Sequence, residues 1–263
     1  MKIDFSGKLV LVTAASRGIG FGIAANLHSM GACVAICARG GAELREASRR
    51  IDPSGQNVFA LAGDVGSAAF LQQLVAKTTH HFGQSIDILI NNNGGPPAGS
   101  AMSRTEQQWR EALDCNFMSA VRLCQLVVPS MQLKHWGRII NLTSLSGKEP
   151  DPGMVLSSVT RVAVAAYGKT LSRELGPDGI TVNTIMTGGV LTDRALGFIR
   201  EEAAANGETL ESAIARVGKT LPVQHIASPD EFAQTILFLA SEEASYVTGV
   251  ALCLDGGASH GLF

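Results

Sequence analysis

The sequence predicts an α/β fold, with one doubly wound parallel sheet of about seven strands and helices on both of its faces. Short apolar runs alternate with amphipathic stretches along the whole chain, and strands that alternate with helices usually pair in parallel. The first apolar run, residues 9–12, leads through a glycine-bearing turn into an amphipathic stretch at residues 21–30. No linker or shift in composition divides the chain, so residues 1–263 are expected to form a single domain.

Composition and charge narrow the class of protein. The 263 residues are 46% hydrophobic and 17% charged, which predicts a compact globule with a sizeable core. A formal net charge of −2 gives no electrostatic reason to expect nucleic acid or an anionic membrane as a partner. The five cysteines show no paired metal-ligand spacing, and no apolar run approaches membrane length or resembles a signal peptide. We therefore expect a cytoplasmic protein without a metal site.

The turn at residues 13–20 has the composition of a phosphate-binding loop. It reads Thr-Ala-Ala-Ser-Arg-Gly-Ile-Gly, between the first expected strand and the first expected helix. Gly18 and Gly20 would let the backbone approach a pyrophosphate closely, and the helix N-terminus would supply N–H groups and a partial positive charge. A tight β-to-α connection is the alternative interpretation. The flanking strand and helix favour a dinucleotide-binding unit of the Rossmann-like type.

The remaining elements follow in alternation. Further strands are expected at residues 32–37, 58–61, 86–90, 138–142, 180–185 and 250–254. Helices are expected at residues 42–50, 68–82, 155–175 and 230–240, and in two segments of residues 103–135 that divide near Asn116. Ligands in such sheets bind beyond the carboxyl ends of the strands. The segment 188–222, with two charged helical pieces, interrupts the alternation and is expected to be a substrate lid rather than a surface insertion.

Several separate stretches resemble the short-chain dehydrogenase/reductase family, in the same order along nearly the whole chain. They are the turn at 13–20, Gly63-Asp64-Val65, Asn91-Asn92-Asn93-Gly94-Gly95, Trp109 with Asn116, residues 141–147, residues 179–183 and the terminal Asp255-Gly256-Gly257. The chain looks most like the β-ketoacyl reductase branch. The resemblance implies a nicotinamide-dependent oxidoreductase that acts on a carbonyl group or on the corresponding alcohol.

The sequence departs from the family at the catalytic residues. The family uses a serine, a tyrosine thirteen residues further on and a lysine four residues beyond that; counted from Ser144, these positions hold Ser157 and Arg161. Neither tyrosine of the chain is well placed to replace the missing one. A serine hydroxyl is a much weaker acid than a phenol, and an arginine stays protonated. The family also usually has glycine at Ala14, where a methyl group crowds the turn if φ is positive.

Three functions remain open at this point. In the first, Ser144 and Ser157 polarise a carbonyl while water or a substrate group supplies the proton, and Arg161 provides positive charge and holds ribose hydroxyls. In the second, the protein is a cofactor-binding subunit of a hetero-oligomer with an intact homologue and has lost turnover. In the third, the fold carries a non-redox reaction such as an elimination or an isomerisation. We favour the first, because the cofactor half of the chain matches the family.

The resemblance assigns further residues to the site. Asn116 matches an asparagine that helps to hold a water chain, with a helix kink as the alternative role. Asn91 and Asn92 match positions beside the ribose and nicotinamide, with turn formation as the alternative, and Asp64 with Val65 matches the adenine side. The expected cofactor contacts are Thr13, Ala15, Ser16, Arg17, Gly18, Ile19, Gly20, Arg39, Asp64, Val65, Asn91, Asn92, Arg161, Gly188 and Thr192.

Charge at the end of the second strand favours NADP over NAD. NAD-binding proteins place a carboxylate there, where this chain has Ala38 followed by Arg39. Arg17 in the phosphate turn adds a second guanidinium group. Two arginines and no acid suit the 2′-phosphate of NADP, unless both are solvated surface residues. We therefore expect NADPH as the cofactor.

The expected substrate is a small-molecule ketone bound under the lid, and the family suggests a 3-oxoacyl thioester as one example. Family members commonly form tetramers through the helices after the fourth and fifth strands and through the C-terminal strand. The apolar faces at residues 121–128 and 162–171 are consistent with a homotetramer, and equally with packing on the sheet.

Overall fold

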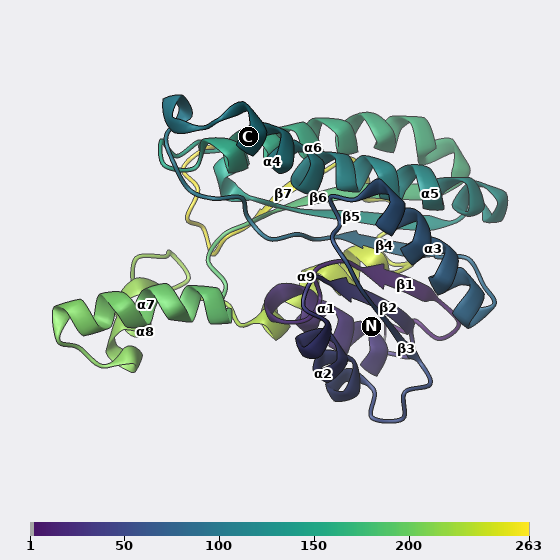
Figure 1. Ribbon diagram of the computed structural model, residues 1–263, viewed down its shortest axis with the longest axis horizontal. Helices are drawn as coiled ribbons and strands as arrows, with labels where there is room; N and C mark the ends of the chain where they lie inside the picture. Colours follow the sequence, from purple (N-terminus) through teal and green to yellow (C-terminus); the bar gives the residue numbers. More distant parts are fainter. Residues whose placement is uncertain (1–2, 263) are drawn as a thin grey trace.

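Seven parallel strands form one sheet in residues 3–262, the part of the chain that the computed structural model describes (Figure 1). The strand order is β3-β2-β1-β4-β5-β6-β7. The strands are β1 (Leu9–Val12), β2 (Cys33–Ala38), β3 (Val58–Ala62), β4 (Ile88–Asn91), β5 (Gly137–Ser144), β6 (Ile180–Thr187) and β7 (Ala251–Leu254). The expected fold class is confirmed: a single-domain, Rossmann-like α/β fold with a doubly wound parallel sheet.

Helices cover both faces of this sheet. One face carries α1 (Gly18–Ser29), α2 (Gly41–Ile51) and α9 (Pro229–Ala240). The other carries α3 (Ala68–Phe82), α5 (Ser119–Lys134) and α6 (Val155–Leu175). α5 is preceded by α4 (Glu106–Leu113) and by a π-helical segment, Asp114–Met118. Short 3-10 turns lie at Ala101–Ser103, Leu145–Gly147 and Gly176–Asp178.

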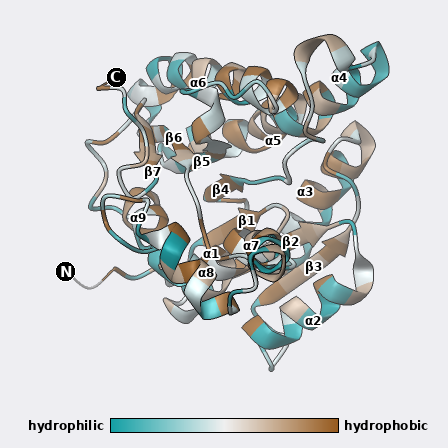
Figure 2. Cartoon of the chain, turned by 90° about the vertical axis from the view of Figure 1, so that its left-hand side faces the viewer, coloured by the Kyte–Doolittle hydropathy of each residue, from teal (hydrophilic) through white to brown (hydrophobic). Residues whose placement is uncertain are grey.

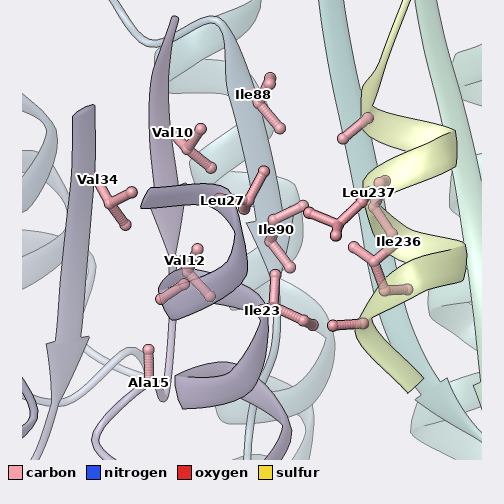
Figure 3. Packing of buried hydrophobic residues seen from close by; sticks show 14 of the residues in the cluster. Val10, Val12, Ala15, Ile23, Leu27, Val34, Ile88, Ile90, Ile236 and Leu237 are labelled. Carbon is pink, nitrogen blue, oxygen red and sulfur yellow. The ribbon is translucent and has the colours of Figure 1, made fainter. Parts of the chain in front are cut away.

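The core consists of two apolar layers, one on each face of the sheet. In the first layer, Ile23 of α1 and Ile236 of α9 point toward the strands (Figure 3). Neighbouring residues of β1 divide between the layers, with Val10 in the first and Leu11 in the second. A strand that is buried on both faces is apolar throughout, which explains the run Leu-Val-Leu-Val in β1. Each fully buried aliphatic side chain contributes about 1.5–3 kcal/mol of transfer free energy.

The strand order reverses between β1 and β4. Val10 of β1 pairs with Val34 of β2 on one side and with Ile88 of β4 on the other. Because all strands are parallel, their carboxyl ends lie at one edge, and the crevice at the reversal is where such sheets bind ligands. Thr13 follows β1 and Asn92 follows β4, so the two stretches expected to bind cofactor meet at this crevice.

Two helices, α7 (Asp193–Asn206) and α8 (Leu210–Gly218), extend away from the rest of the molecule (Figure 1). Figure 2, turned by 90°, shows both helices in front of the strands. They are held together by a small apolar cluster of their own, made of Ile199, Ala203, Ala213 and Ile226. Since α7 follows β6, both helices lie at the carboxyl edge of the sheet. Residues 188–222 thus lie where a lid would be, and their closure over a ligand stays a prediction.

Most boundaries agree with those expected from the sequence. Both α3 and α6 begin and end at the expected residues, and the expected division near Asn116 is the π-helical segment. The strands β5 and β6 run beyond the expected residues 142 and 185, because their ends pair as Thr143↔Met186 and Ser144↔Thr187. The extension carries Ser144 to the very end of β5, at the ligand-binding edge.

Candidate active site

The N-terminus of α1 has no side-chain cap. Arg17 occupies the N-cap position and makes no capping hydrogen bond, whereas Ser67, Thr192 and Ser228 cap α3, α7 and α9. The first N–H groups of a helix have no partner within the helix, and together with the helix dipole they attract an anion. The helix that begins at the crevice therefore has the N–H groups that a pyrophosphate requires.

Gly18 and Gly20 lie at this helix end, where a side chain would meet atoms of the neighbouring segments. Gly18 has a φ of +58°, and a Cβ there would lie 3.1 Å from Thr192 Cγ2. A Cβ at Gly20 would lie 2.6 Å from the carbonyl oxygen of Ala14 and 2.7 Å from Asn92 Nδ2. Both positions thus require glycine, the first for its backbone conformation as well as for space.

Asn92 and Thr13 tie the phosphate turn to the end of β4. The Thr13 hydroxyl donates to the Asn92 carbonyl oxygen and accepts from the Asn92 N–H at 2.8 Å. Asn92 Nδ2 donates to the carbonyl oxygens of Thr13 and Ala14, at 3.2 Å each. Asn92 therefore positions the turn, a role that the expected contact with the cofactor did not include.

Ala14 has a φ of +49°, in the left-handed region. For a residue with a Cβ, the left-handed backbone conformation is roughly 1–2 kcal/mol higher in free energy than the right-handed one. The condition under which the methyl group crowds the turn is thus met. Ala14 is only partly buried.

A cavity of about 260 Å³ lies beside the phosphate turn. Its lining includes three of the expected cofactor residues, Arg17, Gly18 and Thr192. It also includes Arg50 of α2, whose guanidinium carbon lies 4.5 Å from the centre of the Phe21 ring. The other lining residues are Gly22, Leu191, Asp193, Pro229 and Asp230. Sequence reasoning missed Arg50, because its approach to Phe21 depends on how α2 packs against α1.

Arg39 lies in different surroundings from Arg17. Burial and the Asp64 carboxylate raise the pKa of the Cys115 thiol, whereas the positive charge of Arg39 lowers that pKa. Arg39 and Asp64 are therefore both near Cys115, at the end of β2 and β3. Asp64 Oδ1 also accepts from the N–H of Gly66 at 2.9 Å, which fixes the turn that contains Val65. The structure thus groups Arg39 with the expected adenine-side turn and Arg17 with the phosphate turn.

Ser144, Ser146 and Ser157 form a hydroxyl cluster where β5 ends. The Ser146 hydroxyl lies 3.1 Å from Ser144 Oγ and 3.0 Å from Ser157 Oγ. The Ser146 N–H also donates to Ser144 Oγ at 3.2 Å. Ser144 ends β5 and Ser157 lies in the first turn of α6, where it is 3% exposed. The structure therefore brings the two expected serines together through Ser146, a residue that sequence reasoning did not single out.

Arg161 is buried and bonded to the loop after β4. Its Nη1 donates to Asn93 Oδ1 at 2.5 Å and to the Leu142 carbonyl oxygen at 3.2 Å, and its Nη2 lies 3.4 Å from the Asn93 carbonyl oxygen. Asn93 Nδ2 donates in turn to the Cys115 carbonyl oxygen at 2.8 Å. Burial lowers the pKa of Arg161 to about 10, which leaves the guanidinium charged at neutral pH. Asn93 is a third residue, after Arg50 and Ser146, that sequence reasoning missed.

Two expected asparagines lie in the interior. Asn116 in the π-helical segment is 2% exposed, and neither of its amide atoms has a partner among the described residues. Asn91 Nδ2 donates to Asn141 Oδ1 at 2.9 Å and approaches Cys124 Sγ at 3.8 Å. Asn91 thus joins β4 to β5 and α5, whereas Asn116 has an unused hydrogen-bonding group.

The remaining expected contacts lie around the same crevice. The N–H of Ala15 donates to the Cys37 carbonyl oxygen at 3.0 Å, and Ser16 and Ile19 are partly buried beside it. The N–H of Gly188 donates to the Leu254 carbonyl oxygen at 3.0 Å, and a Cβ at Gly188 would lie 2.5 Å from Asp255 Cα. Glycine at position 188 therefore allows the chain after β6 to pack closely against the chain after β7.

A doubly wound parallel sheet, with an uncapped helix N-terminus where the strand order reverses, is typical of Rossmann-like α/β proteins. The family model described as "Enoyl-(Acyl carrier protein) reductase" matches residues 13–259. A 3-oxoacyl-(acyl-carrier-protein) reductase of Vibrio cholerae is 33% identical over 255 residues, which are 97% of this chain and 98% of that protein. The "Dehydrogenase/reductase SDR family member 4" of Pongo abelii is 32% identical and covers 96% of this chain. The chain belongs to the short-chain dehydrogenase/reductase family.

Solved structures agree with this assignment. L-sorbose reductase from Gluconobacter frateurii, complexed with NADPH and L-sorbose, superposes with a TM-score of 0.93 at 32% identity and covers 100% of both chains. An actinorhodin polyketide ketoreductase variant with NADPH gives a TM-score of 0.86 at 31% identity, over 95% of this chain and 97% of that one. Within residues 3–262, none of the helices combines the length and the apolarity that a membrane span requires.

Proposed function

We propose that the protein is an NADP-dependent oxidoreductase that reduces a ketone, of which a 3-oxoacyl compound is one example, or oxidises the corresponding alcohol. The observation that carries the proposal is the meeting of two features at one edge of the sheet. The uncapped N-terminus of α1 with Gly18 and Gly20 lies beside β1, and the hydroxyl cluster of Ser144 and Ser157 lies at the end of β5. The relatives include 3-oxoacyl reductases and NADPH-complexed ketoreductases, which supports both parts of the proposal.

The residues around the crevice fit a nicotinamide dinucleotide. The N–H groups of α1 would hold the diphosphate beside the phosphate turn, whose close packing against α1 requires glycine at position 20. Arg17 and Arg39 would hold the 2′-phosphate by charge-assisted hydrogen bonds. No acidic residue stands at Ala38, where an NAD-specific protein would place one, so NADP is preferred to NAD. When bound, the reduced nicotinamide supplies the hydride.

The side chains of the site would polarise the carbonyl group. Ser144 and Ser157 donate hydrogen bonds to its oxygen, and the charge of Arg161 stabilises the negative charge that develops there. A serine hydroxyl is too weak an acid to release its proton at neutral pH, and a guanidinium stays protonated. The final proton therefore comes from water or from the substrate itself.

Residues 188–222 are proposed to close over the substrate. Thr192 caps α7 and reaches Gly18, so the start of this segment already contacts the phosphate turn. The α7–α8 pair has its own apolar cluster and stands apart from the sheet, which lets it move as a unit. Closure would exclude water from the serine cluster and strengthen its hydrogen bonds to the carbonyl oxygen.

The test is turnover by the purified protein with NADPH and a panel of ketones that includes L-sorbose and a 3-oxoacyl thioester. We expect ketone-dependent oxidation of NADPH, and we expect Ser157→Ala to lower kcat about 10-fold or more while the Kd of NADPH stays unchanged. Ser158→Ala is the matched control, because the hydroxyl of this neighbouring serine is buried and makes no hydrogen bond to the cluster. Equal losses in both variants would count against a role for the Ser157 hydroxyl in the reaction.

A second candidate function is a cofactor-binding subunit of a hetero-oligomer. It is favoured by the residue types at the catalytic positions, because Ser157 and Arg161 give the site no group of suitable acidity. Both side chains are also engaged in hydrogen bonds within the protein. In this case the protein alone would bind NADPH and show no turnover with any ketone, and it would raise the activity of an intact homologue when mixed with it.

Assembly as a homotetramer is a related proposal. Val159 and Val162 on α6 and Leu252 on β7 are apolar and exposed. These surfaces belong to the helices and the edge strand through which members of the family commonly associate.

A further inference from the structure

Arg161 is a buried cation without an anionic partner. Its side chain is 5% exposed, and its hydrogen bonds within residues 3–262 all go to neutral oxygens of Asn93 and Leu142. Burial is the cause of its shifted pKa, and no carboxylate acts in the opposite direction. Buried charges are normally paired, because removing an ion from water costs several kcal/mol. Arg161 therefore carries a buried positive charge that no acidic residue within residues 3–262 neutralises.

The hydrogen bonds of the Arg161 guanidinium show which of its edges is unused. Asn93 Oδ1 and the Asn93 carbonyl oxygen lie along the edge formed by Nη1 and Nη2. Nε is buried without a partner, so the edge formed by Nε and the second proton of Nη2 has hydrogen-bonding capacity that the described residues do not use. Two parallel N–H groups of this kind match the two oxygens of a carboxylate.

A second unpartnered group lies nearby. Asn93 Nδ2 bonds to the Cys115 carbonyl oxygen, so the same side chain that holds Arg161 also holds the residue before Asn116. Both amide atoms of Asn116 are buried without a partner. A buried amide and a buried guanidinium with unused hydrogen-bonding capacity are both costly unless a ligand or ordered water satisfies them.

We propose that Arg161 binds a carboxylate of the substrate, so that the protein acts on a short oxo acid whose carbonyl oxygen reaches Ser144 and Ser157. Ser157 and Arg161 are four residues apart on one face of α6, about 6 Å along the helix axis. In a ligand whose carboxylate and carbonyl are separated by one or two bonds, the carboxylate can contact Arg161 while the carbonyl oxygen contacts Ser157. The inference rests on the proposed function and names the chemical class of its substrate: an acid with a free carboxylate, in preference to a thioester or a neutral ketone.

The experiment compares two ligands of nearly equal shape, acetoacetate and acetoacetamide, by isothermal titration calorimetry. The full-length protein is first saturated with NADP+, with which the ketone cannot be reduced. We expect acetoacetate to bind about 10- to 100-fold more tightly than the amide, because a charge-assisted bidentate contact replaces a neutral one. Arg161→Gln should bring this ratio close to one, and Arg161→Lys should retain part of it.

Arg173→Gln is the matched control, since Arg173 is exposed on the same helix and lies beyond the serine cluster. The ratio of the two dissociation constants is measured within each variant, so a loss of folded protein cancels. The proposal is overturned if the wild-type protein binds both ligands equally or binds neither, or if the preference survives in Arg161→Gln. Failure of NADP+ itself to bind would instead contradict the proposed function, and the preference for acetoacetate would then be measured without cofactor.

Discussion

The double variant Ser157→Tyr/Arg161→Lys should raise ketone reduction by about 100-fold or more, because a well-placed general acid typically contributes 10²- to 10⁴-fold. A phenol at position 157 would lie beside the Ser144–Ser146 hydroxyls, and a nearby ammonium group would lower its pKa toward neutrality. Asn93 Oδ1 and the Leu142 carbonyl oxygen, which now accept from Arg161, remain to orient the lysine. The measurement is kcat for NADPH oxidation under saturating ketone.

The two single variants serve as controls for this prediction. Ser157→Tyr alone should gain less, since Arg161 is held on Asn93 by its Nη1 and cannot adjust to the new phenol. Arg161→Lys alone should gain nothing, because no acid of suitable pKa is added. An unchanged kcat in the double variant, with NADPH still bound, would show that the pocket is closed to ketones and would favour the subunit function.

Gly20→Ala should weaken NADPH binding about 10- to 100-fold. The added methyl carbon would lie 2.6 Å from the Ala14 carbonyl oxygen and 2.7 Å from Asn92 Nδ2, so the phosphate turn must shift. Overpacking of this kind costs about 1–3 kcal/mol, and the shift would also move the N–H groups of α1 away from the diphosphate. The Kd of NADPH from fluorescence titration checks the prediction.

Gly176→Ala is the control for the glycine substitution, because a Cβ at Gly176 meets nothing within 4 Å and the residue lies at the far end of α6. Its Kd for NADPH should equal that of the wild-type protein. Circular dichroism and the thermal midpoint of both variants separate a local change in the turn from unfolding. Equal affinities in Gly20→Ala and the wild type would mean that the diphosphate does not bind at the N-terminus of α1.

The sequence was sufficient to predict the fold because the fold depends on local periodicity. Apolar runs gave the strands, and the boundaries of α3 and α6 followed from amphipathic stretches between clear breaks. The register between strands is a long-range property, and it accounts for the extra length of β5 and β6. Even the kink near Asn116 was predicted, although its π-helical form was not.

The site was less predictable because its contacts join distant segments. Ser146 connects Ser144 to Ser157 only through the 3-10 turn that follows β5. Asn93 precedes two glycines, a pattern that predicts a turn residue. Its hydrogen bond to Arg161 joins positions 68 residues apart. Arg17 lines the cavity beside the phosphate turn together with Arg50 of α2, whose place there depends on how two helices pack.

The most direct test of the account is a fluorescence titration of the purified protein with NADPH and with NADH. The account predicts that NADPH binds about 10- to 100-fold more tightly, because the proposed contacts of Arg17 and Arg39 would be charge-assisted and would require the 2′-phosphate. Arg39→Gln should reduce that preference. Failure of both nucleotides to bind, or equal affinity for the two, would contradict the claim that this chain is an NADP-dependent oxidoreductase.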